Sequence, residues 1–314
     1  MEMRKAFSNY LLEAMAEDER LCVLDADLGN ANATLKLREK YPGRAFDVGI
    51  AEQNMASIAA GLSSYGFIPF ITTFACFASR RICDQVAISC AYAKQNVKIV
   101  GTDPGITAEL NGGTHMAIED FGVLRSIPGI LLFEPCDETE LVKALPQIIE
   151  RPGPAYIRLH RKEVPDVHSG GYDFDLTKAD VLRHGSDVTL FATGAVMVGY
   201  ALEAARLLEG DGISAEVVNV HTLKPIDSEG VVSSAVKTGA AVTCENHSII
   251  GGLYSAVCEA LACRAPVPVL PIGFRDVPGE VGKASELAKK HGMLPEDIAK
   301  AAMAAIELRR AAKK

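Results

Sequence analysis

Residues 46–74 read FDVGIAEQNMASIAAGLSSYGFIPFITTF, and this stretch decides the fold class. Apolar residues recur at helical spacing from Met55 to Leu62, and Gly66 ends the run. An almost uninterrupted apolar segment, residues 67–74, follows at once and has the composition of a buried strand. A helix that leads directly into a fully apolar strand is the repeating unit of a parallel α/β sheet.

The same alternation runs along the whole chain. We expect strands at residues 20–28, 67–74, 96–102, 129–135, 154–160, 187–194, 214–220, 240–246 and 267–273. Helical patterns lie between them, at residues 4–17, 52–65, 78–93, 137–150, 196–209 and 251–263. Apolar strands that alternate with helices form sheets covered on both faces, so the chain is predicted to be an α/β protein.

A polar stretch at residues 160–180 interrupts this rhythm. It contains Pro165 and the pair Gly170–Gly171 and has no clear period, which is typical of a connection between domains. We therefore predict two domains, residues 1–165 and 181–314, with a linker at residues 166–180. Each is predicted to be a mostly parallel sheet with helices on both faces.

Bulk composition excludes several classes of protein. The chain has 314 residues and a net charge of −8, whereas a nucleic-acid-binding protein needs a basic face. No window approaches the roughly 18 apolar residues of a membrane span, and the N-terminus lacks the apolar run of a signal peptide. The eight cysteines are scattered without a Cys-x-x-Cys pair or a paired His spacing. We expect reduced thiols, a cytoplasmic location and no metal ligand in this chain.

Glu52 is a lone acid in the first turn of the predicted helix 52–65. Acids at this position stabilise a helix by interacting with its dipole, and that interpretation needs no function. A functional interpretation requires a reason to bury an acid, and one such reason is a heterocyclic nitrogen that must be protonated.

Two further segments carry candidate chemistry. Phe74 and Phe77 follow a predicted strand and either belong to the core or wall an aromatic ring by stacking. His115 lies in a long, Gly-rich loop after another strand, where ligands of α/β proteins bind. A loop histidine either makes structural hydrogen bonds or transfers protons near neutral pH.

Arginines are the natural partners of an anionic substrate, because guanidinium binds phosphate in a bidentate way. Arg4, Arg158 and Arg161 are the candidates, and each alone is more often part of a surface ion pair. Gly210–Asp211–Gly212 resembles a diphosphate-binding signature, but the asparagine that follows, Asn219, is only seven positions away. We interpret that match as a coincidence.

Several segments together resemble transketolase and, equally, 1-deoxy-D-xylulose-5-phosphate synthase. Those similar to the pyrimidine-binding half are residues 46–66, TTFACF at 72–77, NGGTHMAIEDFGVLRSIPG at 111–129, EPCDETE at 134–140 and RPGPAYIRLHR at 151–161. NVHTLKPID at 219–227 and CENHSIIGGLYSAVCEAL at 244–261 resemble the C-terminal domain of the same enzymes.

A complete enzyme of this family is about twice as long and has an N-terminal domain that holds Mg²⁺ and the diphosphate. The resemblance therefore implies the C-terminal subunit of a split transketolase, partnered by a separate N-terminal subunit in a heterotetramer. The implied cofactor is thiamine diphosphate shared between the two subunits, and the implied reaction moves a two-carbon ketol unit from a ketose phosphate to an aldose.

The resemblance also assigns cofactor-binding roles. The glutamate that matches Glu52 hydrogen-bonds N1′ of the aminopyrimidine and favours its imino form, which is acid–base catalysis through the cofactor. Phe74 and Phe77 match the aromatic pair that encloses the pyrimidine. Asp27 matches an aspartate close to the thiazolium. Arg80 stands in the pyrimidine pocket where transketolases usually keep a tyrosine.

Substrate-binding roles follow in the same way. His115 matches a histidine that binds substrate oxygens and assists proton transfer, and Arg4 and Arg161 match positions that bind the substrate phosphate. Asn111 replaces an aspartate that contacts substrate hydroxyls, and Asp103 stands where transketolases have a histidine and the synthases an acid. With Ala31, which replaces a phosphate-contacting serine, these departures suggest a branched or modified ketose phosphate.

Besides 1-deoxy-D-xylulose-5-phosphate synthase-like activity, which the equal resemblance to that enzyme leaves open, two other functions remain open from the sequence. The beta subunit of a thiamine-dependent 2-oxo acid dehydrogenase has the same two-domain organisation, a similar length and a comparable glutamate. An inactive scaffold or regulatory subunit is the second alternative, against which the retention of Glu52, Phe74, Phe77 and His115 argues. His221 and His247 are interpreted as structural, and we expect the second domain mainly to supply interface area.

Overall fold

Strand β1 (Leu21–Asp25) shows how the sequence builds a sheet that is buried on both faces. Leu21 and Val23 pack on one side against α1 (Met3–Glu17) and α6 (Glu138–Glu150), whereas Cys22 and Leu24 pack on the other side against α3 (Glu52–Ser64). The residues on both faces of the strand are therefore apolar, which explains its uninterrupted hydrophobic sequence.

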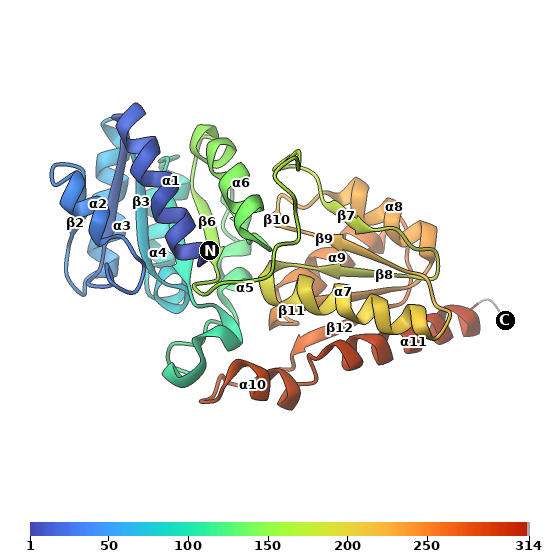
Figure 1. Ribbon diagram of the computed structural model, residues 1–314. Helices are drawn as coiled ribbons and strands as arrows, with labels where there is room; N and C mark the ends of the chain where they lie inside the picture. Colours follow the sequence, from blue (N-terminus) through green and yellow to red (C-terminus); the bar gives the residue numbers. More distant parts are fainter. Residues whose placement is uncertain (313–314) are drawn as a thin grey trace.

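The structure, a computed structural model, describes residues 1–312 and contains two mostly parallel sheets side by side (Figure 1). The first has seven strands in the order β10-β5-β6-β4-β3-β1-β2, and only the β10–β5 pair is antiparallel. Its other strands are β2 (Ala45–Asp47), β3 (Ile68–Phe74), β4 (Lys98–Thr102), β5 (Leu131–Phe133), β6 (Ala155–Leu159) and β10 (Thr222–Lys224).

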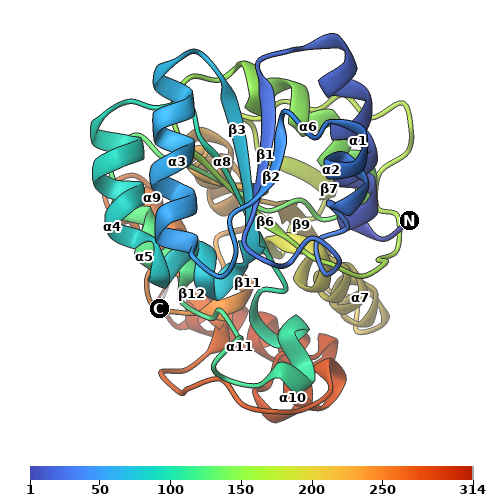
Figure 2. The same ribbon diagram turned by 90° about the vertical axis from the view of Figure 1, so that its left-hand side faces the viewer.

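Helices cover both faces of this sheet, as Figure 2 shows in a view from its end. Besides α1, α3 and α6 they are α2 (Leu35–Lys40), α4 (Cys83–Gln85) and α5 (Asp120–Arg125). The helix expected at 78–93 is not a regular α-helix. Phe77–Arg81 and Val86–Tyr92 are π-helical (η1 and η2) and flank α4. π-Helical turns hold an extra residue and often occur at functional sites.

The second sheet has five strands in the order β12-β11-β8-β9-β7, with only β7 antiparallel. α7 and α11 cover one face, and α8 and α9 cover the other. The elements are β7 (Asp180–Arg183), β8 (Val188–Ala192), β9 (Ala215–Asn219), β11 (Ala241–Ser248), β12 (Val269–Phe274), α7 (Gly194–Gly210), α8 (Ser228–Thr238), α9 (Leu253–Ala262), α10 (Ala284–Lys290) and α11 (Pro295–Ala312). The predicted α/β class with two parallel-sheet domains is confirmed.

Strand β10 does not follow the division expected from the sequence. It comes after β9 in the chain but pairs with β5 of the first sheet, with Thr222 opposite Phe133 and Lys224 opposite Leu132. The connection between β6 and β7, residues 160–179, contains neither helix nor strand. Its Phe174 packs against Phe133 with ring centroids 6.0 Å apart, so this polar segment is anchored to the first sheet.

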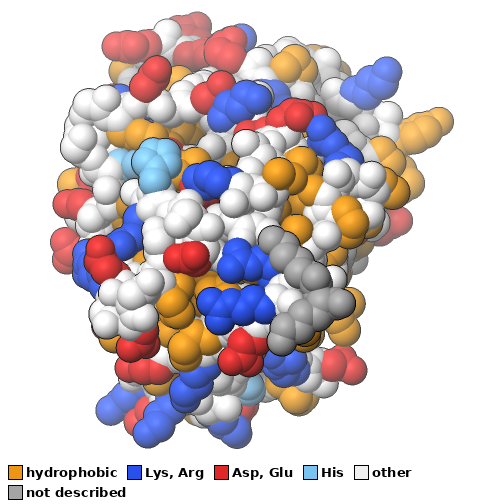
Figure 3. Space-filling model, turned by 90° about the vertical axis from the view of Figure 1, so that its right-hand side faces the viewer, with side chains coloured by type: hydrophobic (Ala, Val, Ile, Leu, Met, Phe, Trp, Pro, Cys, Tyr) orange, Lys and Arg blue, Asp and Glu red, His pale blue; other side chains and the backbone are white. Residues whose placement is uncertain are grey.

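The face of the second domain that points away from the first carries basic and acidic side chains interspersed (Figure 3). Within residues 1–312, no helix combines the length and the hydrophobicity that crossing a membrane requires.

Candidate active site

Glu52 begins α3 directly after the carboxyl end of β2. Gly49, at φ +73°, makes the turn between them, and its amide donates to Asp47 Oδ1 at 2.9 Å. The Glu52 side chain is only 3% exposed, and its Oε1 lies 2.6 Å from Nη1 of Arg81. A buried carboxylate at a helix N-terminus thus has one charged partner, which comes from the π-helical segment η1.

The sequence did not identify Arg81 as a site residue, although one signal was present. Arg81 lies four residues after Phe77, a spacing at which two side chains of a helix are neighbours. Its guanidinium carbon lies 3.8 Å from the centroid of the Phe77 ring. Arg81 therefore connects the buried acid to the aromatic residues through a cation–π contact.

Phe74, Phe77 and His115 form one aromatic group. Phe74 ends β3, Phe77 begins η1, and His115 comes from the loop after η3 (Gly105–Asn111). The ring centroids are 6.1 Å apart for the two phenylalanines, and 6.0 and 5.3 Å from His115 to Phe74 and Phe77, both in edge-on arrangements. The Thr114 hydroxyl lies 2.9 Å from His115 Nδ1 and fixes the orientation of the imidazole.

Asp103 and Arg161 form an ion pair at the other side of Phe74. Arg161 Nε lies 2.9 Å from Asp103 Oδ2, and its guanidinium carbon lies 5.9 Å from the Phe74 ring centroid. Asp103 is 2% exposed and has the left-handed φ of +55°. Burial raises the pKa of Asp103 to about 6, and the nearby Arg161, Lys162 and Arg4 oppose that rise.

These contacts form a continuous line at the carboxyl ends of the central strands. Phe74 ends β3, Asp103 follows β4 and Arg161 follows β6, and this edge is where parallel sheets bind ligands. The line runs in the order Glu52, Arg81, Phe77, His115, Phe74, Arg161, Asp103. Most of the residues assigned by resemblance are thus brought together, although they are far apart in the sequence.

The remaining predicted residues lie around this line. Asp27 is exposed in the turn after β1 at φ +59°, and its amide donates to Asp47 Oδ1 at 3.1 Å. Asn111 is exposed at the end of η3. Arg4 Nη1 donates to the carbonyl of Ala31 at 2.6 Å, which aims its side chain at the loop after β1.

Arg80 contacts the segment that carries His115. Its Nε lies 2.9 Å from Glu119 Oε1, and its Nη2 donates to the Thr114 carbonyl at 3.3 Å. Arg80 is 44% exposed, and its place in a pyrimidine pocket stays a prediction.

The interpretation of Arg158 as an anion clamp is wrong. Arg158 is fully buried, with Nε 2.8 Å from Asp120 Oδ2 and Nη1 2.9 Å from Glu134 Oε1. Its Nη2 donates to the Asn246 carbonyl of β11 at 2.8 Å. The contacts of its guanidinium group therefore belong to a buried network of charged groups that joins the two sheets.

The second domain also holds the loop that carries His115. Asn246 accepts a hydrogen bond from the Ile106 amide at 2.9 Å and donates to the Pro104 carbonyl at 3.1 Å. Gly105 sits between them at φ +55°, where a Cβ atom would lie 2.1 Å from Asn246 Oδ1. The Ala284 amide of α10 donates to Glu109 at 3.3 Å, and Figure 1 shows α10 beside η3.

The expectation that the second domain mainly supplies interface area is therefore incomplete. Its strand β11 and helix α10 fix the position of a loop between β4 and α5. The sequence carried no local signal for this, because Asn246 and Ile106 are 140 residues apart.

Comparison with known proteins identifies the two domains. Residues 1–167 match the family "Transketolase, pyrimidine binding domain", and residues 177–298 match "Transketolase, C-terminal domain". The chain is 52% identical over 300 residues to the 6-deoxy-6-sulfo-D-fructose transketolase subunit SqwH of Clostridium sp. strain MSTE9, covering 96% of this chain and 93% of the relative. It is 35% identical over 301 residues to a subunit of the apulose-4-phosphate transketolase of Phocaeicola vulgatus, covering 96% of each.

A solved structure described as a split gene transketolase, inactive beta4 tetramer, superimposes with a TM-score of 0.92 at 42% identity. The alignment covers 99% of this chain and all of the other. The chain therefore belongs to the transketolase family, as a split subunit made of the pyrimidine-binding and C-terminal domains.

Proposed function

We propose that the chain is the C-terminal subunit of a thiamine diphosphate-dependent transketolase that works with a separate N-terminal subunit. The reaction transfers a two-carbon ketol unit from a ketose with a terminal anionic group to an aldose. The observation that carries this proposal is the buried Glu52, linked through Arg81 to the aromatic group of Phe77, His115 and Phe74.

These residues fit the aminopyrimidine of the cofactor. The ring is flat and aromatic, and Phe74 and Phe77 offer apolar faces, while Glu52 offers a carboxylate for a ring nitrogen. When bound, thiamine diphosphate supplies the carbanion chemistry that protein side chains lack. In this proposal Glu52 exchanges a proton with the ring nitrogen, and the phenylalanines orient the ring and exclude water from the hydrogen bond.

The substrate end of the site is the pair Asp103–Arg161 with Arg4 nearby. Two guanidinium groups favour a terminal phosphate or sulfonate despite the negative net charge of the chain. His115 lies between this end and Glu52, where it exchanges protons with substrate oxygens. The names of the two relatives above refer to a sulfonated and to a phosphorylated modified ketose, which supports the modified donor expected from Asn111 and Asp103.

The proposed partner supplies what this chain does not contain. A Gly-Asp-Gly followed by a distant asparagine would hold Mg²⁺ and the diphosphate, and we place that signature on the N-terminal subunit. The term subunit in the names of the relatives, and the inactivity ascribed to a tetramer of a similar chain alone, support assembly with a second polypeptide. Two copies of each subunit make the proposed heterotetramer.

Co-expression with a candidate N-terminal transketolase subunit from the same organism tests the proposal. The purified complex is assayed with thiamine diphosphate and Mg²⁺ against xylulose 5-phosphate, fructose 6-phosphate and 6-deoxy-6-sulfofructose as donors. Pyruvate with glyceraldehyde 3-phosphate tests synthase activity, and 2-oxo acids with a lipoyl domain test dehydrogenase activity. Ketol transfer from a modified ketose is the expected result, whereas turnover of pyruvate or a 2-oxo acid alone would reject it.

Glu52→Gln keeps the shape of the side chain but removes its acid–base function. The variant complex is expected to lose about 10²- to 10⁴-fold in kcat, the usual contribution of a positioned acid–base group. Glu39→Gln, an exposed change at the end of α2, is the matched control and should leave kcat unchanged. Wild-type turnover by the Glu52→Gln complex would refute the role given to this acid.

A further inference from the structure

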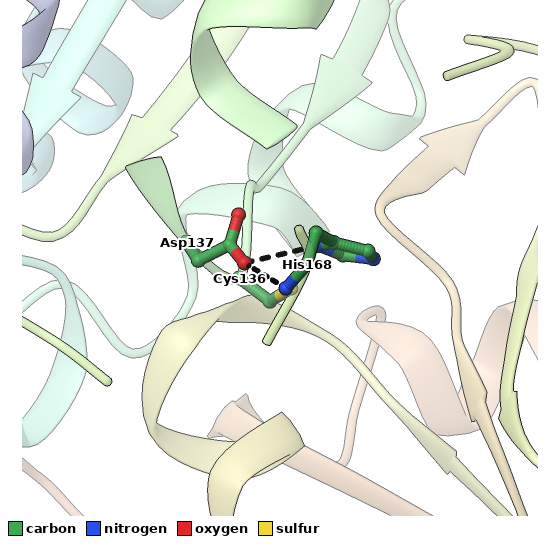
Figure 4. A group of neighbouring side chains, drawn as sticks. All are labelled: Cys136, Asp137 and His168. Carbon is green, nitrogen blue, oxygen red and sulfur yellow. Dashed lines mark hydrogen bonds and ion pairs between the residues drawn. The ribbon is translucent and has the colours of Figure 1, made fainter. Parts of the chain in front are cut away.

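Cys136, Asp137 and His168 form a buried cluster at the junction of the two sheets (Figure 4). Cys136 and Asp137 lie between β5 and α6, and His168 comes from the connection between β6 and β7. The side chains of Asp137 and His168 are 0% and 4% exposed, and Cys136 is 1% exposed. A thiol, a carboxylate and an imidazole therefore meet away from solvent.

The distances between the three donor atoms suit a single metal ion. His168 Nδ1 lies 3.1 Å from Asp137 Oδ2 and 3.7 Å from Cys136 Sγ, and all three atoms lie within 4.8 Å of one another. Tetrahedral zinc, with bonds of about 2.0–2.3 Å, separates its N, O and S ligands by roughly 3.3–3.6 Å. The distance from His168 Nδ1 to Asp137 Oδ2 is slightly below this range, and the distance to Cys136 Sγ is slightly above it.

Neighbouring groups orient the three side chains as the surroundings of a metal site do. His168 Nε2 lies 2.9 Å from Asp180 Oδ2, so the nitrogen that faces away from the cluster has a carboxylate partner. Asn219 Nδ2 lies 3.5 Å from Cys136 Sγ, where it donates to the sulfur. The amides of Val167 and His168 donate to Asp137 Oδ2 at 2.8 and 2.6 Å.

The charge of the cluster favours a cation. The carboxylates of Asp137, Glu140 and Asp180 surround it, and among residues 1–312 the group that forms ion pairs with Asp137 and Asp180 is His168 itself. A metal ion bound at Nδ1 of His168 would take over the compensation of the Asp137 charge. Buried carboxylates are costly unless positive charge compensates them. Glu140 Oε2 accepts a hydrogen bond from the Cys136 amide at 2.7 Å, so a further carboxylate oxygen lies against the cluster.

We propose that Cys136, Asp137 and His168 bind one Zn²⁺ ion as three protein ligands, with the fourth tetrahedral position left to a water molecule. Thiolate and imidazole ligands select zinc over Mg²⁺ and Ca²⁺, and binding releases the thiol proton of Cys136 to solvent. His168 also borders an open surface cavity formed with Met1, Glu138 and Lys143, which gives the ion a route to the cluster. The ion joins the 160–179 connection to the start of α6.

Sequence spacing cannot reveal this site, because His168 is 31 residues from Asp137 and no paired motif marks it. The proposal departs in this respect from the expectation that the chain has no metal ligands. It does not depend on the proposed transketolase activity, since the isolated full chain suffices to test it.

The test measures Zn²⁺ content and binding on the purified full chain, followed by Co²⁺ substitution. Wild type is expected to retain about one Zn²⁺ per chain after dialysis, and its Co²⁺ form is expected to show the ultraviolet charge-transfer band of a thiolate ligand. Cys136→Ser should abolish the band, and His168→Gln should weaken Zn²⁺ binding at least about 100-fold.

Cys90→Ser, at a buried cysteine in η2, is the matched control and should keep both the band and the affinity. Circular dichroism confirms that each variant is folded, and His168→Gln provides the answer if Cys136→Ser does not fold. Absence of the band from wild type, or equal Zn²⁺ binding by wild type and His168→Gln, would overturn the proposal. The cluster would then be held by its hydrogen bonds alone.

Discussion

Replacing Asn246 by alanine should release the loop that carries His115 without touching that loop. The Ile106 amide donates to Asn246 Oδ1, and both residues are buried, at 0% and 3% exposure. In Asn246→Ala this amide has no acceptor and no access to water as long as the loop stays closed.

The magnitude of the loss of loop stability follows from the Ile106 amide, which is left without an acceptor. A buried polar group that loses its partner costs about 1–3 kcal/mol. The Pro104 carbonyl also loses its bond to Asn246, but this adds little to the cost. It still accepts hydrogen bonds from the Thr107 amide at 3.2 Å and from the Thr107 hydroxyl at 2.6 Å. The loop should therefore open about 5- to 150-fold more often.

Hydrogen exchange followed by mass spectrometry measures this opening on the isolated chain. Peptides within residues 103–117 should exchange faster by that factor in Asn246→Ala, while peptides from α1 and α7 should not change. Asn54→Ala, an exposed change on α3, serves as the control. Unchanged protection of residues 103–117, in a variant whose melting temperature falls, would show that Asn246 is only interface packing.

Two further predictions concern the buried charges. Arg158→Met should lower the free energy of unfolding by about 3–5 kcal/mol, since Asp120 and Glu134 lose their partner, and a loss below about 1 kcal/mol in urea titrations would contradict this. Burial raises the pKa of Glu245 from 4.5 to about 8, so between these values the folded chain holds a proton that the unfolded chain releases. Ionisation of Glu245 therefore lowers the free energy of unfolding as the pH rises through that window. Glu245→Gln should reduce the difference between the melting temperatures at pH 5.5 and pH 8.5. An unchanged difference would contradict the prediction.

The strands that form the two sheets could be predicted because each is apolar on both faces. Residues 67–74 illustrate this, since every residue of β3 except Phe74 is buried, and the structure has the strand at Ile68–Phe74. The periodicity of 78–93 was misleading, because a pattern of apolar residues does not distinguish 3.6 residues per turn from the wider π-helical turn. The contact of Arg81 with Phe77 was within reach of the sequence, because residues four apart on a helix are neighbours, whereas its ion pair with Glu52 joins segments 29 residues apart.

Contacts between distant segments could not be predicted at all. A resemblance assigned Glu52, Phe74, Phe77 and His115 to one site, but nothing local in the sequence places Asn246 against Ile106 or Asp103 against Arg161. Strand β10 is three residues long, too short for a period to appear, and its partner was decided by the packing of the two domains.

The position of β10 limits how the polypeptide can be divided. Cutting anywhere in residues 160–179 would strip the seventh strand from the first sheet and expose the backbone edge of β5, which invites aggregation through strand pairing. The shortest N-terminal fragment that retains the complete sheet must run to Lys224 and so include β7, β8, α7 and β9 of the other half. The first half of the molecule thus needs a strand that the second half supplies, and it cannot be excised as an independent module.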